Sequence, residues 1–262
     1  MPRFAANLSF LWADRPFMAR FDAAARAGFR AVEYMFPYTE DINAIAGELR
    51  RLKLRQVLFN LPAGDWAAGE RGIAVSPTRR AEFRDGVRVA VEVARRLACP
   101  RVNCLVGKQL EHVPIEEQWA TLVDNVKHAA AVFEQAGLVL LVEPVNTFDI
   151  PGFFLRTSVE AFHLQDAVGA ANLRVQFDVY HAQRMEGNLT QTLTRNIGRI
   201  GHIQVADAPD RGQPGTGEIN FTNLFRALDR TDYGGEVGLE YRPTGPTDES
   251  FEWIEEMGYT RE

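Results

Sequence analysis

Four polar residues mark the ends of strand-like runs in the second half of the sequence. Glu143 follows the unbroken apolar run at 138–142, Asp178 and Glu240 close two further runs, and Gln204 lies in the run between those two. Carboxylates gathered at one end of an apolar layer repel one another, so the pKa of each would rise or the fold would lose stability. A divalent cation removes this conflict, and oxygen donors of this kind suit Mg²⁺ or Mn²⁺. These four residues are therefore candidate metal ligands, with Mg²⁺ as the expected ion.

The alternative is that the four residues make separate salt bridges to arginines in the loops. Their shared position at the ends of successive strands favours one common site. A structural zinc site is not expected, because Cys99 and Cys104 lack the spacing of metal ligands. The same spacing predicts two reduced, buried thiols and no disulfide framework.

Two further side chains stand close in sequence to the proposed ligands. His181 follows Asp178 by three residues, and Arg211 lies on the loop that follows Gln204. A single histidine is more often structural, and a loop arginine is usually only solvated. Beside a metal site in an acidic protein, however, His181 becomes a candidate to hold a substrate oxygen and Arg211 a candidate to bind an anionic substrate.

The loop at 61–77 is long and shows no secondary structure of its own. Loops of this length are often functional and can fold over the mouth of a site as a lid. Glu70 and Arg71 lie on this loop and are candidate substrate-binding residues. Lys108, just past the fourth strand, and Arg242 are weaker candidates for binding an anion.

The elements that must position these residues alternate along the whole chain. Apolar runs bounded by turn residues indicate strands, and apolar residues at helical spacing follow each run. The expected strands span 4–10, 31–36, 54–60, 101–107, 138–144, 173–181, 200–207 and 235–241. The expected helices span 16–27, 41–52, 83–97, 115–133, 158–168, 190–197, 221–228 and 249–257.

Eight βα units in 262 residues predict a single-domain (β/α)₈ TIM barrel that occupies residues 1–262. An open doubly wound sheet is the main alternative, but no glycine-rich phosphate loop follows the first strand. Active sites of (β/α)₈ barrels lie at the carboxyl ends of the strands, where the four candidate ligands would meet.

The composition sets limits on the partners of the protein. Hydrophobic residues make up 46% of the chain, charged residues 24%, and the net charge is −6. An acidic protein is poorly suited to broad nucleic-acid binding, so the expected partner is a small molecule. No apolar run approaches the ~20 residues of a membrane span, and residues 1–12 lack a secretory signal pattern. We therefore expect a cytoplasmic protein without a membrane anchor, and the sequence leaves open whether it forms a homo-oligomer.

Several longer motifs resemble the hydroxypyruvate isomerase family. The resemblance covers nearly the whole chain in order, and the longer motifs are the specific ones. They read FAANLSF, GFRAVEYMFPY, NLPAGDWAAGERGIA, NCLVGK, VEPVNTFDIPGF, FDVYHAQRMEGNLT, GHIQVADAPDRGQPGTGEIN and GLEYRP. The wider group that the chain resembles is the xylose-isomerase-like barrels, which also include sugar epimerases and metal-dependent abasic-site endonucleases.

The resemblance implies a divalent-metal isomerase of small sugar acids, with Glu143, Asp178, Gln204 and Glu240 as metal ligands. It also implies that Glu143 and Glu240 exchange protons with an enediolate as hydroxypyruvate becomes tartronate semialdehyde. Many epimerases of the wider group have histidine where this chain has Gln204. A neutral amide oxygen is a harder ligand than imidazole and favours Mg²⁺.

Other functions remain open alternatives. An isomerase that converts 2-oxotetronate to 3-oxotetronate would use the same chemistry in a larger pocket. A ketose 3-epimerase is less expected, because a neutral sugar needs no cations to bind it. An abasic-site endonuclease should carry more histidines and a basic face, and this chain has 5 His. A non-catalytic barrel that binds a sugar acid would be free to lose its carboxylates.

Overall fold

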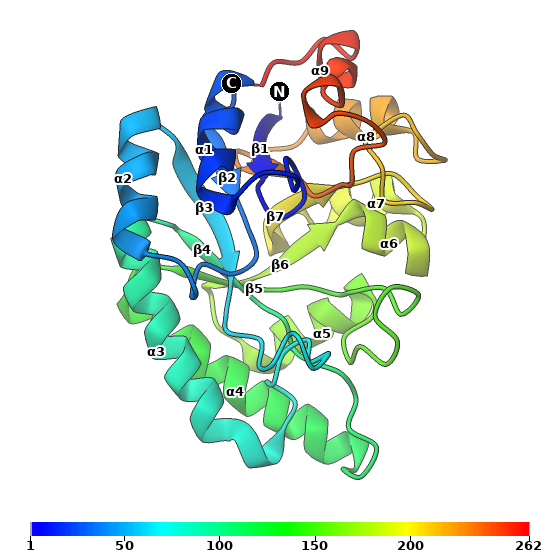
Figure 1. The fold of residues 1–262 in the computed structure, drawn as a ribbon. Coiled ribbons are helices and arrows are strands. Elements are labelled where there is room, and N and C mark those ends of the chain that lie inside the picture. The colour runs from blue at the N-terminus through cyan, green and yellow to red at the C-terminus, as the bar shows by residue number, and fades with distance from the viewer. Residues whose placement is uncertain (1, 262) are drawn as a thin grey trace.

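The eight predicted strands form, and each pairs in parallel with the next until β8 pairs with β1 and closes the barrel. The structure is a computed structural model and describes residues 2–261 (Figure 1). The strands are β1 (Arg3–Asn7), β2 (Ala31–Glu33), β3 (Arg55–Asn60), β4 (Arg101–Cys104), β5 (Val139–Val142), β6 (Leu173–Asp178), β7 (Ile200–Val205) and β8 (Glu236–Leu239).

Helices surround the barrel on its outer side (Figure 1). Within the described residues they are α1 (Phe17–Arg26), α2 (Ile42–Leu52), α3 (Arg80–Leu97), α4 (Ile115–Gln135), α5 (Ser158–Val168), α6 (Val179–Met185), α7 (Leu189–Arg195), α8 (Phe221–Leu228) and α9 (Glu252–Glu256). Asp41 caps α2 as expected, since its side chain accepts hydrogen bonds from the backbone N–H groups of Asn43 and Ala44.

Helix α6 corrects one sequence prediction. The strand expected at 173–181 ends at Asp178, and the next residues begin a helix that the sequence pattern did not predict. The Asp178 carboxylate accepts hydrogen bonds from the backbone N–H groups of Tyr180 (2.8 Å) and His181 (3.4 Å). Such N-capping satisfies donors that the first helical turn leaves free, so the chain turns from strand to helix without a loop.

The apolar run of β5 packs on both of its faces, as the sequence indicated. Leu140 and Val142 belong to the large layer between barrel and helices, whereas Leu141 lies with Ala31 and Leu58 in a small separate cluster. Alternate residues of a strand point to opposite faces, so this small cluster fills the inside of the barrel. Packing on both faces of β5 therefore fixes the position of Glu143, the residue that follows the strand.

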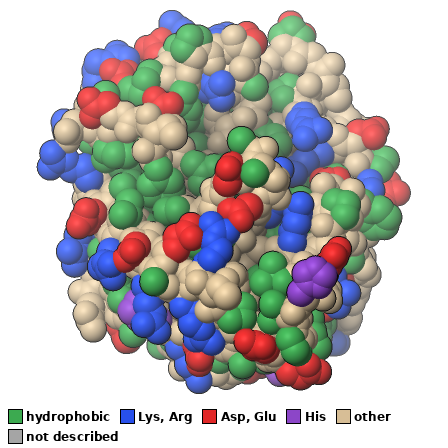
Figure 2. Space-filling model, turned by 60° about the horizontal axis from the view of Figure 1, so that its bottom comes forward, with side chains coloured by type: hydrophobic (Ala, Val, Ile, Leu, Met, Phe, Trp, Pro, Cys, Tyr) green, Lys and Arg blue, Asp and Glu red, His purple; other side chains and the backbone are tan. Residues whose placement is uncertain are grey.

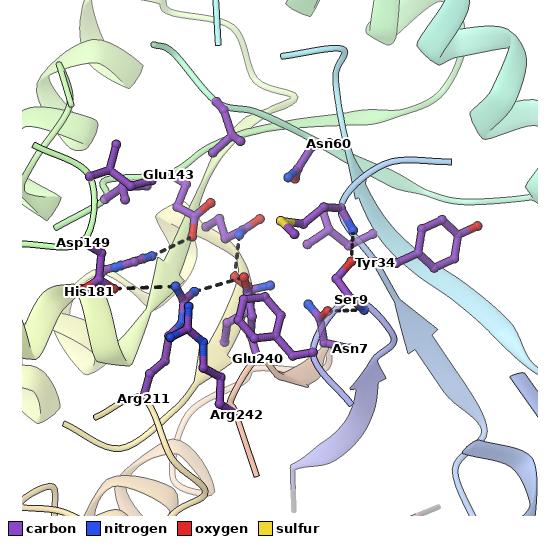
Figure 3. A pocket seen from close by; sticks show the side chains of 18 of the residues that line it. Asn7, Ser9, Tyr34, Asn60, Glu143, Asp149, His181, Arg211, Glu240 and Arg242 are labelled. Atoms are coloured by element: carbon purple, nitrogen blue, oxygen red, sulfur yellow. Dashed lines mark hydrogen bonds and ion pairs between the residues drawn. The ribbon is translucent and has the colours of Figure 1, made fainter. Parts of the chain in front are cut away.

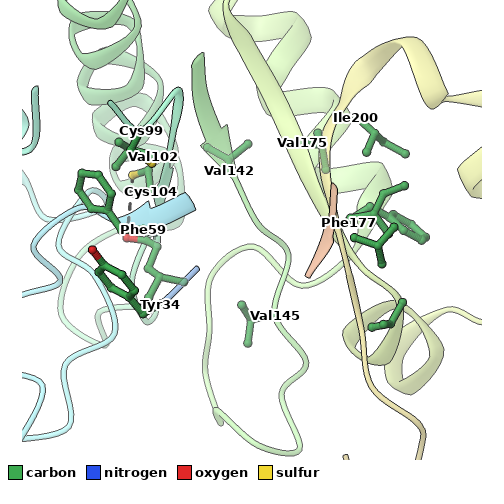
Figure 4. Close-up of a cluster of buried hydrophobic side chains, with 14 of the residues drawn as sticks. Tyr34, Phe59, Cys99, Val102, Cys104, Val142, Val145, Val175, Phe177 and Ile200 are labelled. Atoms are coloured by element: carbon green, nitrogen blue, oxygen red, sulfur yellow. Dashed lines mark hydrogen bonds between the residues drawn. The ribbon is translucent and has the colours of Figure 1, made fainter. Parts of the chain in front are cut away.

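Cys99 and Cys104 lie in the outer layer beside Phe59 and Val102 (Figure 4). Both thiols are free and buried, as predicted. Burial raises the pKa of each thiol to about 12. These cysteines are therefore packing residues, since the thiolate that metals and electrophiles require is disfavoured.

Glu236 ties four strands together at the amino end of the barrel. Its carboxylate pairs with Arg55 (2.7 Å) and Arg101 (3.3 Å) and lies 3.8 Å from Arg3. These partners stand on β3, β4 and β1, and Glu236 itself begins β8. The pairing closes the end of the barrel opposite to the predicted site.

The surface carries charges of both signs. Acidic side chains lie among the basic ones on the face that Figure 2 shows, which includes loops at the lower edge of Figure 1. Among residues 2–261, no helix combines the length and the apolar character that a membrane crossing needs.

Candidate active site

A cavity of about 650 Å³ opens at the carboxyl ends of the strands. Side chains from strands on all sides of the barrel point into it (Figure 3). Of the residues predicted from the sequence, the lining contains Glu143, Gln204, Glu240, His181, Arg211, Arg71 and Arg242. The closed barrel therefore brings together side chains that lie far apart in the sequence.

Glu143 and Glu240 are buried carboxylates on the wall of this cavity. Burial raises the pKa of Glu143 to about 8, and the charge of Asp178 adds to the shift. Burial also raises the pKa of Glu240 well above its ordinary value, although Arg211 opposes the shift. Asn103 donates to the Glu143 carboxylate at 2.8 Å. The two glutamates thus have the environment of groups that exchange protons near neutral pH.

Asp178 and Glu143, with His181 beside them, form a carboxylate pair that could hold a divalent cation. One ligand atom from each lies within 4.8 Å of the others. Asp178 Oδ1 is used in capping α6, whereas Asp178 Oδ2 is buried and has no hydrogen-bond partner among the described residues. An unsatisfied carboxylate oxygen beside a second carboxylate is the donor set that a hard cation requires, so the residues fit the predicted metal.

The hydrogen bonds of His181 decide which of its nitrogens faces the site. Asn146 Nδ2 lies 2.6 Å from His181 Nδ1, and the backbone N–H of Asn146 donates to the same nitrogen. The side-chain oxygen Oδ1 of Asn146 accepts a hydrogen bond from the backbone N–H of Asp149. The side-chain nitrogen Nδ2 must therefore face the His181 ring. Both partners of Nδ1 are donors, so the proton of a neutral ring sits on Nε2.

Burial lowers the pKa of His181 well below its ordinary value, and Arg211 adds to this shift. The ring is therefore neutral, with its Nε2–H directed at the cavity, 3.7 Å from Asp178 Oδ2 and 4.0 Å from Glu143 Oε1. In this tautomer His181 is a hydrogen-bond donor rather than a ligand, which supports its predicted contact with a substrate oxygen.

Arg211 lies between the carboxylates. Its guanidinium pairs with Glu240 (3.1 Å) and lies 3.7 Å from Asp178 and 3.8 Å from Asp149. The side chain also stacks against Phe10, at 4.8 Å from the ring centre. The sequence predicted a substrate-binding arginine here, and the structure adds that Arg211 neutralises the acidic groups of the site.

Gln204 is held at both ends of its amide. Gln204 Nε2 donates to Glu33 at 2.7 Å, and Gln176 Nε2 donates to Gln204 Oε1 at 2.5 Å. Gln204 pairs in register with Asp178 on the neighbouring strand. Gln204 is therefore the direct neighbour of Asp178 across the sheet, and its amide oxygen accepts the hydrogen bond from Gln176.

The loop after β3 contributes Arg71 but not Glu70 to the cavity lining. Arg71 stacks on Trp66, with its guanidinium carbon 3.9 Å from the ring centre, and donates to the carbonyl of Glu70. Glu70 binds the backbone N–H of Asp65 and pairs with Arg79, which fastens the loop. Lys108 also stands outside the lining, and its backbone forms a bridge with Phe153.

Comparison with known proteins identifies the family of the chain. The sequence profile of the xylose isomerase-like TIM barrel family matches residues 21–257. The chain belongs to this family. The hydroxypyruvate isomerase of Escherichia coli K12 is 51% identical over 255 residues, which cover 97% of this chain and 99% of that protein.

Two further known proteins are similar to this chain in sequence. The 2-oxo-tetronate isomerase of Cupriavidus necator is 42% identical over 254 residues and covers 97% of this chain and 98% of its own. A crystal structure from Brucella melitensis, titled AP endonuclease, family 2, is 43% identical with a TM-score of 0.95, covering 98% of this chain and 99% of its own.

Several residues of this xylose isomerase-like site were not predicted from the sequence. Asp149, Asn7 and Gln176 line the cavity, and Asn146 orients His181 from the loop after β5. Asn7 was visible as the polar end of the first strand. The others carry no signal of their own in the sequence, because their importance comes from contacts that the closed barrel creates.

Proposed function

We propose that the chain is a divalent-metal-dependent isomerase that converts hydroxypyruvate to tartronate semialdehyde. The observation that carries the proposal is the pair of buried carboxylates, Glu143 and Glu240, on the wall of one cavity with raised pKa values. The 51% identity to a hydroxypyruvate isomerase over nearly the whole chain supports the choice of substrate.

The reaction moves a carbonyl group between two adjacent carbons. One glutamate removes a proton from the hydroxyl-bearing carbon, which gives an enediolate, and the other glutamate returns a proton to the neighbouring carbon. The hydroxyl proton of the first carbon is lost as its oxygen becomes the new carbonyl, and the oxygen of the neighbouring carbon gains a proton as it becomes the new hydroxyl. One C–H and one O–H proton therefore leave the first carbon and its oxygen, and one of each is gained at the second. Without a bound cation, burial raises the pKa of Glu143 above its ordinary value, and a cation at the site would lower it again.

A divalent cation, when bound, supplies positive charge that stabilises the enediolate oxygens. Asp178, Glu143, Gln204 and Glu240 are the residues that would hold it, with Mg²⁺ expected and Mn²⁺ as the alternative. His181 donates its Nε2–H to a substrate oxygen. Arg211, Arg71 and Arg242 line the cavity and supply cations for the substrate carboxylate.

Solvent deuterium exchange tests the proposal directly. Hydroxypyruvate incubated with the protein and Mg²⁺ in deuterated water should gain deuterium at the carbon that loses its proton, as observed by NMR. A chelator should abolish the exchange, and added Mg²⁺ should restore it. Exchange that is absent with Mg²⁺, or that continues unchanged with chelator, would contradict the proposed mechanism.

A four-carbon substrate is the second candidate, because a 2-oxo-tetronate isomerase covers the chain at 42% identity. The cavity of about 650 Å³ offers space beyond a three-carbon acid. Relative kcat/KM for hydroxypyruvate and 2-oxotetronate with Mg²⁺ separates the two. An endonuclease function is disfavoured by the net charge of −6 and by the mixed charges in Figure 2.

A further inference from the structure

Glu33 is a buried carboxylate that the proposed chemistry does not use. It ends β2, its side chain is inaccessible to solvent, and three side-chain N–H groups converge on it. Asn7 Nδ2 lies 2.9 Å and Gln204 Nε2 2.7 Å from Oε1, and His202 Nε2 lies 2.6 Å from Oε2. A charge placed in the barrel interior is costly unless it is fully hydrogen-bonded, and this one has donors on both oxygens.

Gly238 on β8 leaves room for this carboxylate. It pairs in register with Gln204, and a Cβ atom at position 238 would overlap both oxygens of Glu33. Gly238 has no positive φ that would require glycine for conformational reasons. Glycine at position 238 therefore leaves the space in which the Glu33 carboxylate contacts Gln204.

The contact between Glu33 and Gln204 fixes the direction of an amide. A carboxylate accepts hydrogen bonds and cannot donate them, so Gln204 must turn its NH₂ group towards Glu33. Its carbonyl oxygen then faces the other way, towards Gln176, which lines the cavity together with Gln204. Without Glu33, only the hydrogen bond from Gln176 would oppose a half-turn of this amide, which would present the NH₂ group that repels a cation.

We infer that Glu33 is a positioning residue that keeps the carbonyl oxygen of Gln204 directed at the divalent cation. The inference rests on the proposed function, since it assigns Gln204 to the metal. Residues that orient a ligand from behind commonly change metal affinity or activity by about 10- to 100-fold when they are replaced. Glu33 would give a glutamine the fixed direction that a metal-binding site needs.

Isothermal titration of the metal-free protein with Mn²⁺ tests the inference. Glu33→Gln keeps the shape of the side chain but can turn its own NH₂ group towards Gln204, so we expect Mn²⁺ affinity about 10- to 100-fold weaker than wild type. Glu236→Gln is the matched control, because Glu236 is a buried glutamate on a strand at the other end of the barrel. Its Mn²⁺ affinity should equal that of wild type, and equal affinity in Glu33→Gln would overturn the inference.

A double-mutant cycle separates positioning from a general structural role. In a Gln204→Ala background, Glu33→Gln should cause no further loss of Mn²⁺ affinity, because the group that it orients is gone. A further loss of about the same size as in the Gln204 protein would show that Glu33 acts by another route.

If the Glu33→Gln variant does not fold, a double variant, Glu33→Gln with Gln204→Glu, replaces it in the test. The double variant swaps the two residue types. Residue 33 then donates and residue 204 accepts, so folding and Mn²⁺ binding should return, and failure to recover either would overturn the inference. If wild type itself binds no Mn²⁺, the proposed function fails. If wild type binds Mn²⁺ and Glu33→Gln binds it equally well, only the role of Glu33 fails.

Discussion

At the residue scale, the two glutamates of the site differ in what balances their charge. Glu240 pairs with Arg211, whereas Glu143 accepts from the neutral amide of Asn103 and faces Asp178. Glu240 therefore has a cationic partner at ion-pair distance that Glu143 lacks, although burial raises the pKa of both groups. Different surroundings of the two carboxylates are compatible with one group accepting a proton while the other donates one.

Replacement of Glu240 by glutamine tests its role in proton transfer. The amide keeps the shape of the side chain but cannot take up a proton, so kcat should fall by at least ~10² while the melting temperature stays close to wild type. Steady-state kinetics on hydroxypyruvate measure the effect. Glu116→Gln on the exposed first turn of α4 is the control and should leave kcat unchanged. Near-normal turnover of Glu240→Gln would remove it from the proton-transfer step.

Asn146→Asp tests the tautomer of His181. A carboxylate at position 146 would accept a hydrogen bond from Nδ1–H and so favour the tautomer that carries its proton on Nδ1. Nε2 would then have no proton to donate to a substrate oxygen. We expect kcat/KM to fall by roughly 10-fold or more, the usual scale for groups that orient a site residue. The ¹⁵N chemical shifts of the His181 ring identify the protonated nitrogen. Unchanged ring shifts together with unchanged kcat/KM would contradict this role for Asn146.

At the element scale, Asp178 does two jobs at the junction of β6 and α6. One carboxylate oxygen caps the helix, and the other has no hydrogen-bond partner among the described residues, with Arg211 at 3.7 Å. Burial raises the pKa of Asp178, so the ionised group costs stability when no cation is present. The side chain that caps the helix carrying His181 therefore also supplies an oxygen at the site.

Two substitutions of Asp178 separate these jobs. Asp178→Asn keeps an oxygen for the cap and removes the charge, whereas Asp178→Ala loses both. Without metal, the alanine variant should be about 0.5–2 kcal/mol less stable than the asparagine variant in urea denaturation. Both variants should lose the thermal stabilisation that Mn²⁺ gives to wild type. Equal stability of the two variants would mean that the cap contributes nothing.

The junction at Asp178 also shows what the sequence could not reveal at this scale. Val179 and Tyr180 favour strands, so the run at 173–181 resembled one continuous strand. A capping carboxylate overrides that preference by satisfying the first N–H groups of a helix. Element types were predictable from periodicity, but the point at which β6 gives way to α6 depended on one side-chain hydrogen bond.

At the scale of the whole molecule, the Glu236 cluster joins strands that are far apart in sequence. Burial tends to raise the pKa of Glu236, but the hydrogen bond from Arg55 and the charge of Arg101 outweigh it and hold the pKa below its ordinary value of 4.5. A folded-state pKa below the unfolded one stabilises the protein above the unfolded pKa. That stability is lost as the pH falls through the lower, folded-state value.

Glu236→Gln should therefore destabilise the protein at pH 7 by roughly 1–2 kcal/mol, a modest value because Arg3 and Arg55 are half exposed and screened. The difference from wild type should shrink below pH 4.5, where wild type also loses the ion pairs. Urea denaturation at pH 7 and at pH 3 measures both differences. A difference that stays constant with pH would show that the cluster acts by packing alone.

The sequence by itself determined the barrel and part of the cavity lining at the carboxyl ends of its strands. Alternating strands and helices allow few topologies, and parallel strands must place their carboxyl ends at the same edge. Glu143, Gln204 and Glu240 could therefore be grouped in one cavity from their places in the sequence. Such statements depend only on local periodicity and on the direction of the chain.

Only the tertiary structure decided which side chain faces which. Arg211 lies between Glu240 and Asp178, Glu33 lies behind Gln204, and Glu70 turns away to fasten its loop. Each of these outcomes depends on the stagger of strands round a closed barrel and on the path of a loop. A sequence pattern does not encode distances between residues as far apart as Glu33 and Gln204, because closure of the barrel alone brings them into contact.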